Sequence, residues 1–344
     1  MCGIAGFVND MPIDVKCPVL QRMTDMIAHR GPDSEGHYID EHAALGHRRL
    51  SIIDLGGGQQ PIYNEDGSKV ITFNGEIYNY QTLREELIAA GHTFTTKSDT
   101  EVLLHGYEQW GVDLLQRVRG MFTFVIWDKN KQELFGARDH FGIKPFYYAK
   151  MNGTFMYASE IKSLLRHPDF VKKLNAEALK PYMTFQYPAI GETFFKGVYK
   201  LPEGHYFTYR DGKMDIHRYY DEDFREGKQK LGELVNSIDQ TVCDSVKAHQ
   251  IADVEVGSFL SSGVDSSYVA AVARPQHTYS IGFGKGTYNE SQQAGELAEL
   301  LKLNNTAESL TDEEAFAAFP RIQWHLDEPD SNPSCVPLYF LSAL

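Results

Sequence analysis

The sequence predicts two domains of different classes, an α+β layered domain followed by an α/β domain with a parallel sheet. A length of 344 residues corresponds to about two domains. Residues 1–200 are dense in short strand signals and have few helical ones, whereas strand and helix signals alternate beyond residue 230. We therefore expect domains at 2–210 and 230–344, joined by a polar linker at 211–229.

Runs rich in β-branched and aromatic residues predict the strands of the first domain. They occupy residues 3–8, 69–73, 121–127, 133–137 and 145–149, and a turn at 201–204 leads into a further strand. Apolar residues at helical spacing predict helices at 19–28, 80–90 and 100–110.

The second domain begins with a long helical pattern at 230–249. Strands are predicted at 254–260, 278–283 and 307–310, and helices at 266–273, 290–303, 312–324 and 336–344. This alternation is typical of βαβ units, which form a parallel sheet. Since three strands are fewer than a typical sheet contains, we expect this domain to be incomplete.

Composition excludes several classes of protein. The chain is 42% apolar and 23% charged, which is ordinary for a globular protein. A net charge of −14 without a long Lys/Arg block argues against a nucleic-acid partner, and no apolar stretch is long enough for a transmembrane helix. No secretory signal is recognisable and the four cysteines form no CxxC motif, so we expect a cytoplasmic protein with reduced thiols.

Cys2 is the first candidate for chemistry. If Met1 is removed, the Cys2 thiol and a free α-amino group lie on one residue. That amine titrates near neutral pH and can accept the thiol proton. The alternative is a cysteine that stands near the terminus by chance.

Four further segments, 29–33, 47–54, 74–79 and 138–145, are rich in Arg, Asp, Asn and Gly. Together with Cys2-Gly3-Ile4 they resemble the class II glutamine amidotransferase domain over about residues 2–205. The resemblance implies an N-terminal-nucleophile sandwich with αββα layers. It also implies that Cys2 attacks the glutamine amide while Asn74 and Gly75 hold the oxyanion. Without the resemblance, Asn-Gly after a strand would read as a hairpin turn.

The same resemblance assigns residues to the amino-acid end of glutamine. Arg49 would pair with the α-carboxylate of glutamine. The alternative is an arginine exposed on the surface, where most arginines in proteins lie. Glu76 and Asp99 would hold the α-ammonium group. Asp99 also has a structural reading, because residues 98–101 match a helix capping box.

A loop rich in small residues joins a strand to a helix in the second domain. It contains Ser261, Ser262, Gly263, Asp265 and Ser266, and such loops direct N–H groups toward anions. It resembles the pyrophosphate loop of adenylating ATP pyrophosphatases, but Ser262 stands where a glycine is usual. The alternative is an ordinary strand–helix turn.

That second resemblance implies ATP as a substrate, with Leu260 and Ile281 beside the nucleotide. Asp265 would help to place Mg²⁺, or would serve only as a helix N-cap.

The pairing of the two domains resembles the glutamine-hydrolysing asparagine synthetase family. It implies glutamine, aspartate and ATP as substrates, and it is compatible with a homo-oligomer. The chain lacks a further Ser-Gly-Glu-Gly motif of that family, so we expect residues 1–344 alone not to complete the synthetase reaction. Two alternatives remain: an amidotransferase for another carboxylate acceptor, and a non-catalytic fragment that binds glutamine.

Overall fold

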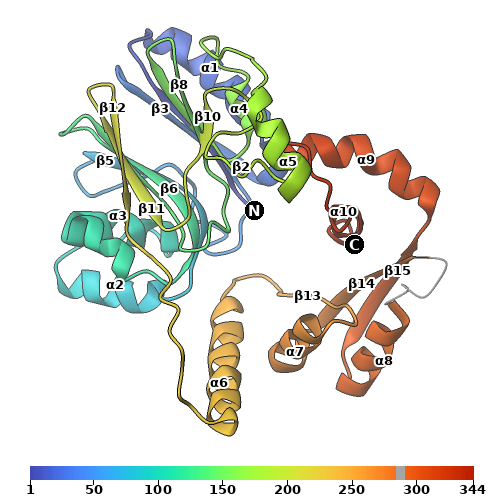
Figure 1. Cartoon of the computed structure of the whole chain (residues 1–344). Coiled ribbons are helices and arrows are strands. Elements are labelled where there is room, and N and C mark those ends of the chain that lie inside the picture. Colours follow the sequence, from blue (N-terminus) through green and yellow to red (C-terminus); the bar gives the residue numbers. More distant parts are fainter. Residues whose placement is uncertain (284–290) are drawn as a thin grey trace. The chain divides into compact units, whose positions relative to one another are not determined.

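The computed structural model describes residues 1–283 and 291–344. They form two compact units, Met1–Asp223 and Phe224–Leu344. In Figure 1 the first runs from blue to yellow and the second from orange to red, and each is described by itself.

Two six-stranded antiparallel sheets form the body of the first unit. One has the strand order β10-β8-β9-β1-β3-β2, comprising β1 (Gly3–Val8), β2 (Ser34–Ile39), β3 (Ala43–Arg49), β8 (Tyr147–Met151), β9 (Thr154–Ala158) and β10 (Val198–Lys200). The other has the order β12-β11-β7-β6-β5-β4, comprising β4 (Ile62–Tyr63), β5 (Lys69–Ile77), β6 (Gly120–Asp128), β7 (Glu133–Arg138), β11 (His205–Arg210) and β12 (Lys213–Arg218).

The main core lies between these sheets. Side chains of the first sheet such as Ile4 and Tyr157 are buried against side chains of the second such as Trp127 and Phe207. Alternate residues of β1 point the other way, so that Phe7 enters a second core beneath helix α1. β1 is therefore buried on both faces and fixes the position of the Cys2 backbone next to it.

Helices cover the outer faces of both sheets (Figure 1). α1 (Ile13–Asp25) and α4 (Ile161–Leu164) pack on the first sheet, and α3 (Asp99–Trp110) packs on β5 and against α2 (Tyr80–Ala89). A further helix, α5 (Leu179–Phe185), precedes β10, and three short 3₁₀ turns lie at Ala28–Arg30, Gly111–Gln116 and Ala176–Ala178. The predicted αββα layering is confirmed.

The second unit contains a three-stranded parallel sheet in the order β13-β14-β15. Its elements are α6 (Leu231–His249), β13 (Ser258–Phe259), α7 (Val264–Ala273), β14 (His277–Phe283), α8 (Ser291–Leu301), β15 (Asn304–Leu310), α9 (Asp312–Leu326) and α10 (Cys335–Leu341). Leu260 packs on small side chains of α7 and α8 to form a modest core. The predicted α/β class of this unit is confirmed.

Some element boundaries differ from those predicted. β12 lies inside the expected linker 211–229, because its six residues pair in full register with β11. The strand expected at 254–260 shrinks to the two residues of β13, and the helix expected at 19–28 begins at Ile13 and ends at Asp25. The expected start of the helix at 290 lies outside the described residues.

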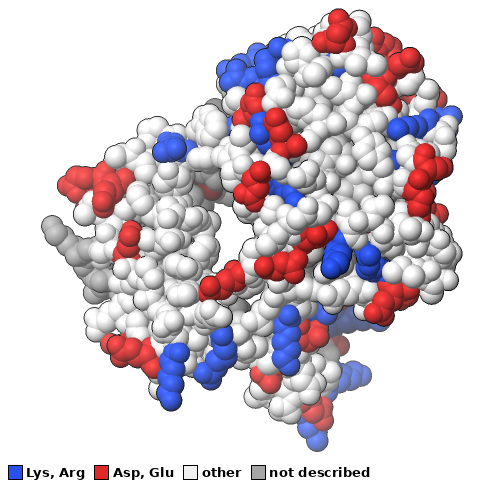
Figure 2. Space-filling model, turned by 180° about the vertical axis from the view of Figure 1, so that it is seen from behind, with Lys and Arg blue, Asp and Glu red and all other residues white. Residues whose placement is uncertain are grey.

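No helix in the described ranges has the length and hydropathy to cross a membrane. On the face shown in Figure 2, acidic and basic side chains are interspersed in small groups.

Candidate active site

A pocket in the first unit brings together all six residues expected to handle glutamine. They come from segments far apart in the sequence: the residue before β1, the end of β3, the second half of β5 and the start of α3. The six are Cys2, Arg49, Asn74, Gly75, Glu76 and Asp99.

The Cys2 thiol lies against the backbone of Leu50. Its Sγ is 3.4 Å from the Leu50 nitrogen, whose N–H points to it, and 3.5 Å from the Leu50 oxygen. Arg30 Nε donates to the Cys2 carbonyl at 3.0 Å and anchors the chain there. Burial raises the pKa of the Cys2 thiol and lowers the pKa of the Met1 amino group beside it. Both shifts favour the neutral forms of the two groups.

Arg49 is buried and held by the loop that follows β3. Its Nη2 donates to the carbonyl oxygens of Ile53 at 3.1 Å and Asp54 at 2.7 Å. A Cβ atom on Gly58 would lie only 2.7 Å from this nitrogen. The loop therefore fixes the guanidinium group through two carbonyls and one glycine, and the sequence analysis did not single out that glycine.

Side chains rather than a strand cover the edge of β5 that faces the pocket, because β4 pairs only with the first part of β5. Gln60 Oε1 accepts the Phe73 N–H at 2.7 Å, and its Nε2 donates to the Phe73 oxygen at 3.2 Å. Further along the same edge, Asp99 Oδ2 accepts the Ile77 N–H at 3.0 Å. Gln60 was also missed by the sequence analysis, since nothing in its neighbourhood marks it as an edge cover.

Gly75 lies between these two covered positions. On the neighbouring strand β6, the Phe122 N–H donates to Asp139 Oδ2 at 3.1 Å, and the Phe122 oxygen accepts the Asp139 N–H at 2.8 Å. The backbone of Phe122 is thus bonded to Asp139 and not to Gly75, which lies opposite it. Because backbone groups alternate along an antiparallel strand, the Gly75 N–H points away from β6 and toward the pocket. A Cβ atom at Gly75 would lie 2.2 Å from the Met121 oxygen, so the close approach of the strands requires glycine here.

The Asn74 side chain is 1% exposed. Within the part of the chain that the structure describes, neither its Oδ1 nor its Nδ2 atom has a hydrogen-bond partner. Buried amides are almost always hydrogen-bonded, so a side chain of this kind that lines a pocket indicates a ligand.

The Asp99 carboxyl is buried, and burial raises its pKa to about 7. Burial is the largest cause of this shift, and the negative charge of Glu76, which lines the same pocket, acts in the same direction. The bond from the Ile77 N–H acts in the opposite direction. Asp99 thus contributes an acidic group that is half-ionised near neutral pH.

The capping box expected at 98–101 is only half formed. Ser98 Oγ accepts the Thr100 N–H at 3.1 Å, as an N-cap does. Glu101 instead accepts the N–H groups of Thr95 and Thr96, both at 2.7 Å, and so ties down the preceding loop. The Asp99 carboxyl therefore points to β5 through Oδ2, while its Oδ1 accepts from Ser98 Oγ at 3.4 Å.

Lys144 is a further pocket residue that the sequence analysis did not assign. It is 2% exposed, its Nζ lies 2.7 Å from Met1 Sδ, and burial lowers its pKa. Met1 therefore occupies the pocket beside Cys2 in the chain as it is encoded.

The loop of the second unit lies beside an apolar cavity. Of the seven residues expected to bind ATP, Leu260, Ser261, Ser266 and Ile281 line it, together with side chains of β14 and α10. Ser262, Gly263 and Asp265 do not line the cavity and are exposed. The structure thus brings four of these residues together and leaves three on the surface of the loop.

Hydrogen bonds of serine hydroxyl groups connect the two ends of this loop. Ser261 Oγ and Ser266 Oγ are 2.7 Å apart, and the Gly263 N–H donates to Ser261 Oγ at 3.1 Å. Ser262 has no positive φ, so its backbone position does not require the glycine that is usual there.

Two known protein families match this chain, one over each unit. The family described as "Glutamine amidotransferase domain" matches residues 1–220, and "Asparagine synthase" matches residues 237–344. The first unit, with its pocket around Cys2, is therefore a glutamine amidotransferase domain.

The chain as a whole belongs to the asparagine synthetase family. It is 43% identical to asparagine synthetase [glutamine-hydrolyzing] 1 of Bacillus subtilis over 99% of this chain and 55% of that protein. It is 32% identical to a putative asparagine synthetase of Methanocaldococcus jannaschii over 100% of this chain and 72% of that protein. It is also 31% identical to Amidase chry2 of Gibberella zeae over 96% of this chain and 54% of that protein. The chain spans about half the length of most of these curated relatives.

Proposed function

We propose that the first unit hydrolyses glutamine to glutamate and ammonia, and that the whole protein uses this ammonia to convert aspartate into asparagine. The observation that carries the proposal is Asn74, a buried amide with no hydrogen-bond partner among residues 1–283 and 291–344, in the same pocket as Cys2. Membership of the asparagine synthetase family supports the acceptor and the use of ATP.

Removal of Met1 starts the proposed glutaminase mechanism, because it exposes the α-amino group of Cys2. This amine takes the thiol proton while Sγ attacks the amide carbon of glutamine. The Asn74 side-chain N–H and the Gly75 backbone N–H stabilise the oxyanion. The C–N bond then breaks, the nitrogen receives the proton and leaves as ammonia, and water hydrolyses the thioester to glutamate.

The other end of glutamine would be held by charge. The Arg49 fork suits a carboxylate, and the loop carbonyls keep it in place. Glu76 and Asp99 would accept the α-ammonium group. These three contacts discriminate free glutamine from a glutamine side chain within a peptide, which lacks both charged groups.

The second unit would activate the acceptor. The β-carboxylate of aspartate attacks the α-phosphorus of ATP, pyrophosphate leaves, and ammonia then displaces AMP from the acyl-adenylate. Leu260 and Ile281 would flank the base within the apolar cavity, and the exposed loop at Ser262 and Gly263 would lie toward the phosphates.

Asp265 fits a role in holding Mg²⁺. Its carboxylate is exposed on the first turn of α7, beside the loop proposed for the phosphates. Mg²⁺ is commonly bound through one or two carboxylates together with substrate phosphates, and it would neutralise charge on the pyrophosphate.

A cytoplasmic location is part of the proposal, since the mechanism needs Cys2 as a free thiol. All four cysteines are unpaired in the structure.

A different carboxylate acceptor is the second candidate, because the relatives of this chain include one with a name other than asparagine synthetase. A non-catalytic role in glutamine binding is the third.

The experiment supplies glutamine labelled with ¹⁵N in the side-chain amide, with ATP and aspartate, and follows glutamate, AMP and labelled asparagine. Glutamate release by the wild-type chain and its loss in Cys2→Ser support the glutaminase. Absence of glutamate release from a chain that has lost Met1 overturns it. AMP release with other carboxylates but not with aspartate would select the second candidate.

A further inference from the structure

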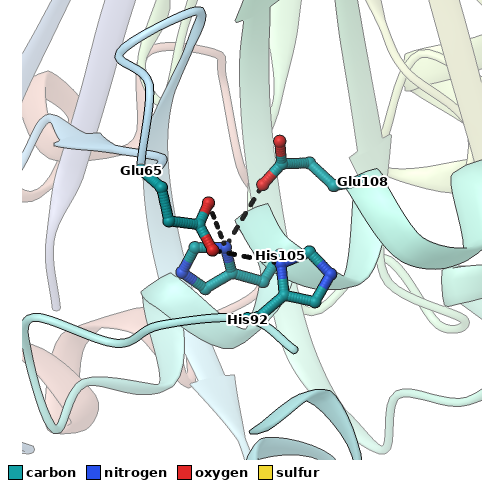
Figure 3. A group of neighbouring side chains, drawn as sticks. All are labelled: Glu65, His92, His105 and Glu108. Carbon is teal, nitrogen blue, oxygen red and sulfur yellow. Dashed lines mark hydrogen bonds and ion pairs between the residues drawn. The ribbon is translucent and has the colours of Figure 1, made fainter. Parts of the chain in front are cut away.

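A second cluster of chemistry-bearing side chains lies in the first unit, outside the glutaminase pocket. Figure 3 shows Glu65 from the β4–β5 turn, His92 from the α2–α3 loop, and His105 and Glu108 from α3. Each contributes one potential ligand atom, and these four atoms all lie within 4.8 Å of one another.

The spacing of these atoms matches a metal site. His105 Nδ1 is 3.2 Å from Glu108 Oε2 and 3.4 Å from Glu65 Oε2. His92 Nδ1 is 3.2 Å from Glu65 Oε1. Ligand atoms at ordinary zinc bond lengths in a tetrahedron are about 3.3 Å apart. Small movements of the side chains would therefore surround an ion.

The outer nitrogen of each imidazole faces an oxygen atom. His92 Nε2 is 3.3 Å from Gln109 Oε1. His105 Nε2 lies 3.5 Å from Glu101 Oε1, which is an ion-pair distance without a hydrogen bond among the described residues. Imidazoles that bind metals are usually oriented in this way, through a carboxylate or carbonyl on the nitrogen away from the ion. Both Nδ1 atoms are thus turned toward the centre of the cluster, and this observation is independent of the ligand spacing.

The carboxylates are also positioned. Asn64 Nδ2 donates to Glu108 Oε1 at 2.7 Å, and Lys69 Nζ lies 3.3 Å from the same oxygen. The Asn64 and Lys69 side chains thus hold Glu108 Oε1, which faces away from the cluster. The other oxygen, Glu108 Oε2, remains directed at His105. The His105 side chain is fully buried, whereas Glu65 is 37% exposed and leaves a route for entry.

We propose that Glu65, His92, His105 and Glu108 bind one divalent transition-metal ion of the zinc class as a structural clamp. Two imidazoles and two carboxylates form a set that suits Zn²⁺, and four protein ligands are typical of structural sites. The ion would fasten the β4–β5 turn and the α2–α3 loop to α3. The first residue of that helix, Asp99, lies in the glutaminase pocket.

The test uses the full chain, treated with a chelator and then titrated with Zn²⁺ or Co²⁺. We expect about one equivalent to bind, with the visible absorption of tetrahedral Co²⁺, and Zn²⁺ to raise the melting temperature. Glu65→Gln and His92→Gln should weaken binding more than tenfold. Gln109→Ala, which leaves all four ligands in place, should weaken it about tenfold.

Glu85→Gln is the matched control, because Glu85 is an exposed carboxylate on α2, outside the cluster. It should bind and respond to Zn²⁺ as the wild type does. Absence of stoichiometric binding by the wild-type chain would show that the cluster is an ion-pair network only. Binding that survives unchanged in Glu65→Gln and His92→Gln would place the ion elsewhere, and would equally overturn the proposal. Both variants change partly exposed side chains, and their melting curves in chelator check that they fold.

Discussion

At the scale of single residues, Asn74 has an environment that a purely structural role does not explain. Its amide is buried and has no partner in the part of the chain that the structure describes, although leaving a buried polar group unsatisfied costs about 1–3 kcal/mol. The oxyanion that forms in the transition state would accept a hydrogen bond from the Asn74 side-chain N–H. This bond would stabilise the transition state and so raise the rate.

Asn74→Ala should therefore lower kcat for glutamine hydrolysis by about 10²–10³-fold, with little change in KM. It should change the melting temperature only slightly, because the removed amide has no hydrogen-bond partner among the described residues and lines a pocket. The exposed Asn130→Ala serves as the control. Steady-state glutamate release and thermal unfolding check both parts, and an unchanged kcat would remove Asn74 from the oxyanion site.

Asp99 predicts how glutamine binding depends on pH. Its pKa is raised to about 7, and only its ionised form attracts the α-ammonium group of glutamine. The affinity should therefore be full above pH 7 and weaken by up to about tenfold per pH unit below it. Calorimetric titration of glutamine into the non-hydrolysing Cys2→Ala variant measures this, and a flat profile from pH 5.5 to 8.5 would contradict it.

The raised pKa of Asp99 also predicts how the stability of the fold depends on pH. An acid whose folded pKa lies above its unfolded value destabilises the fold once it ionises, so the cost appears as the pH rises from about 4 to about 7. Asp99→Asn should melt higher than the wild type at pH 8 and close to it at pH 4. Equal melting temperatures at both values would show that burial does not perturb Asp99.

That the six residues expected to handle glutamine share one pocket could be predicted from the resemblance, because they lie in ordered motifs with distinctive side chains. Gly58 and Gln60 could not, because their roles arise from packing. A Cβ on Gly58 would collide with Arg49, and Gln60 replaces a strand at the edge of β5. Neither role can be recognised from the composition or the hydrophobic periodicity of the neighbouring sequence.

At the scale of elements, the incomplete pairing of β4 with β5 exposes the strand edge that builds the site. Gln60 saturates both backbone groups of Phe73 and thereby stabilises that edge.

Gln60→Leu should lower the free energy of unfolding of the first unit by about 1–3 kcal/mol, because the buried Phe73 N–H loses its partner. The Phe73 oxygen keeps its contact with His47 Nε2 at 3.0 Å. Gln81→Leu, an exposed change on α2, should have little effect. Urea unfolding followed by tryptophan fluorescence reports on the buried Trp127. Equal midpoints for the two variants would show that water replaces the side chain without cost.

Elements with strong periodicity or β-rich composition were predicted well, such as α3 and the strands around residues 121–137. Strands β2 and β3 escaped prediction because histidine, glycine and arginine interrupt them. They become strands through pairing with each other and with β1, which is tertiary information.

At the scale of the whole molecule, the chain separates into two compact units joined by an exposed stretch without regular structure at 221–230. Residues 221–229 of this stretch lie within the linker expected at 211–229. The exact end of the first unit could not be predicted, because β12 is polar and is defined by its pairing with β11.

Brief trypsin treatment should cut first at Arg225, Lys228 or Lys230, since all three are exposed in this stretch. The N-terminal fragment should retain the glutaminase pocket, because every lining residue lies before the cut. Early cleavage within residues 1–218 would contradict the independence of the first unit.

The central claim is that Cys2, once Met1 is removed, is the nucleophile of a glutaminase. The most direct measurement is the intact mass of the purified chain before and after treatment with 6-diazo-5-oxo-norleucine, a glutamine-like electrophile, followed by peptide mapping. We predict loss of Met1 and a single adduct on Cys2 that excess glutamine prevents, with no adduct on the exposed Cys17. Retained Met1, or a processed chain that forms no adduct at Cys2, would contradict the account.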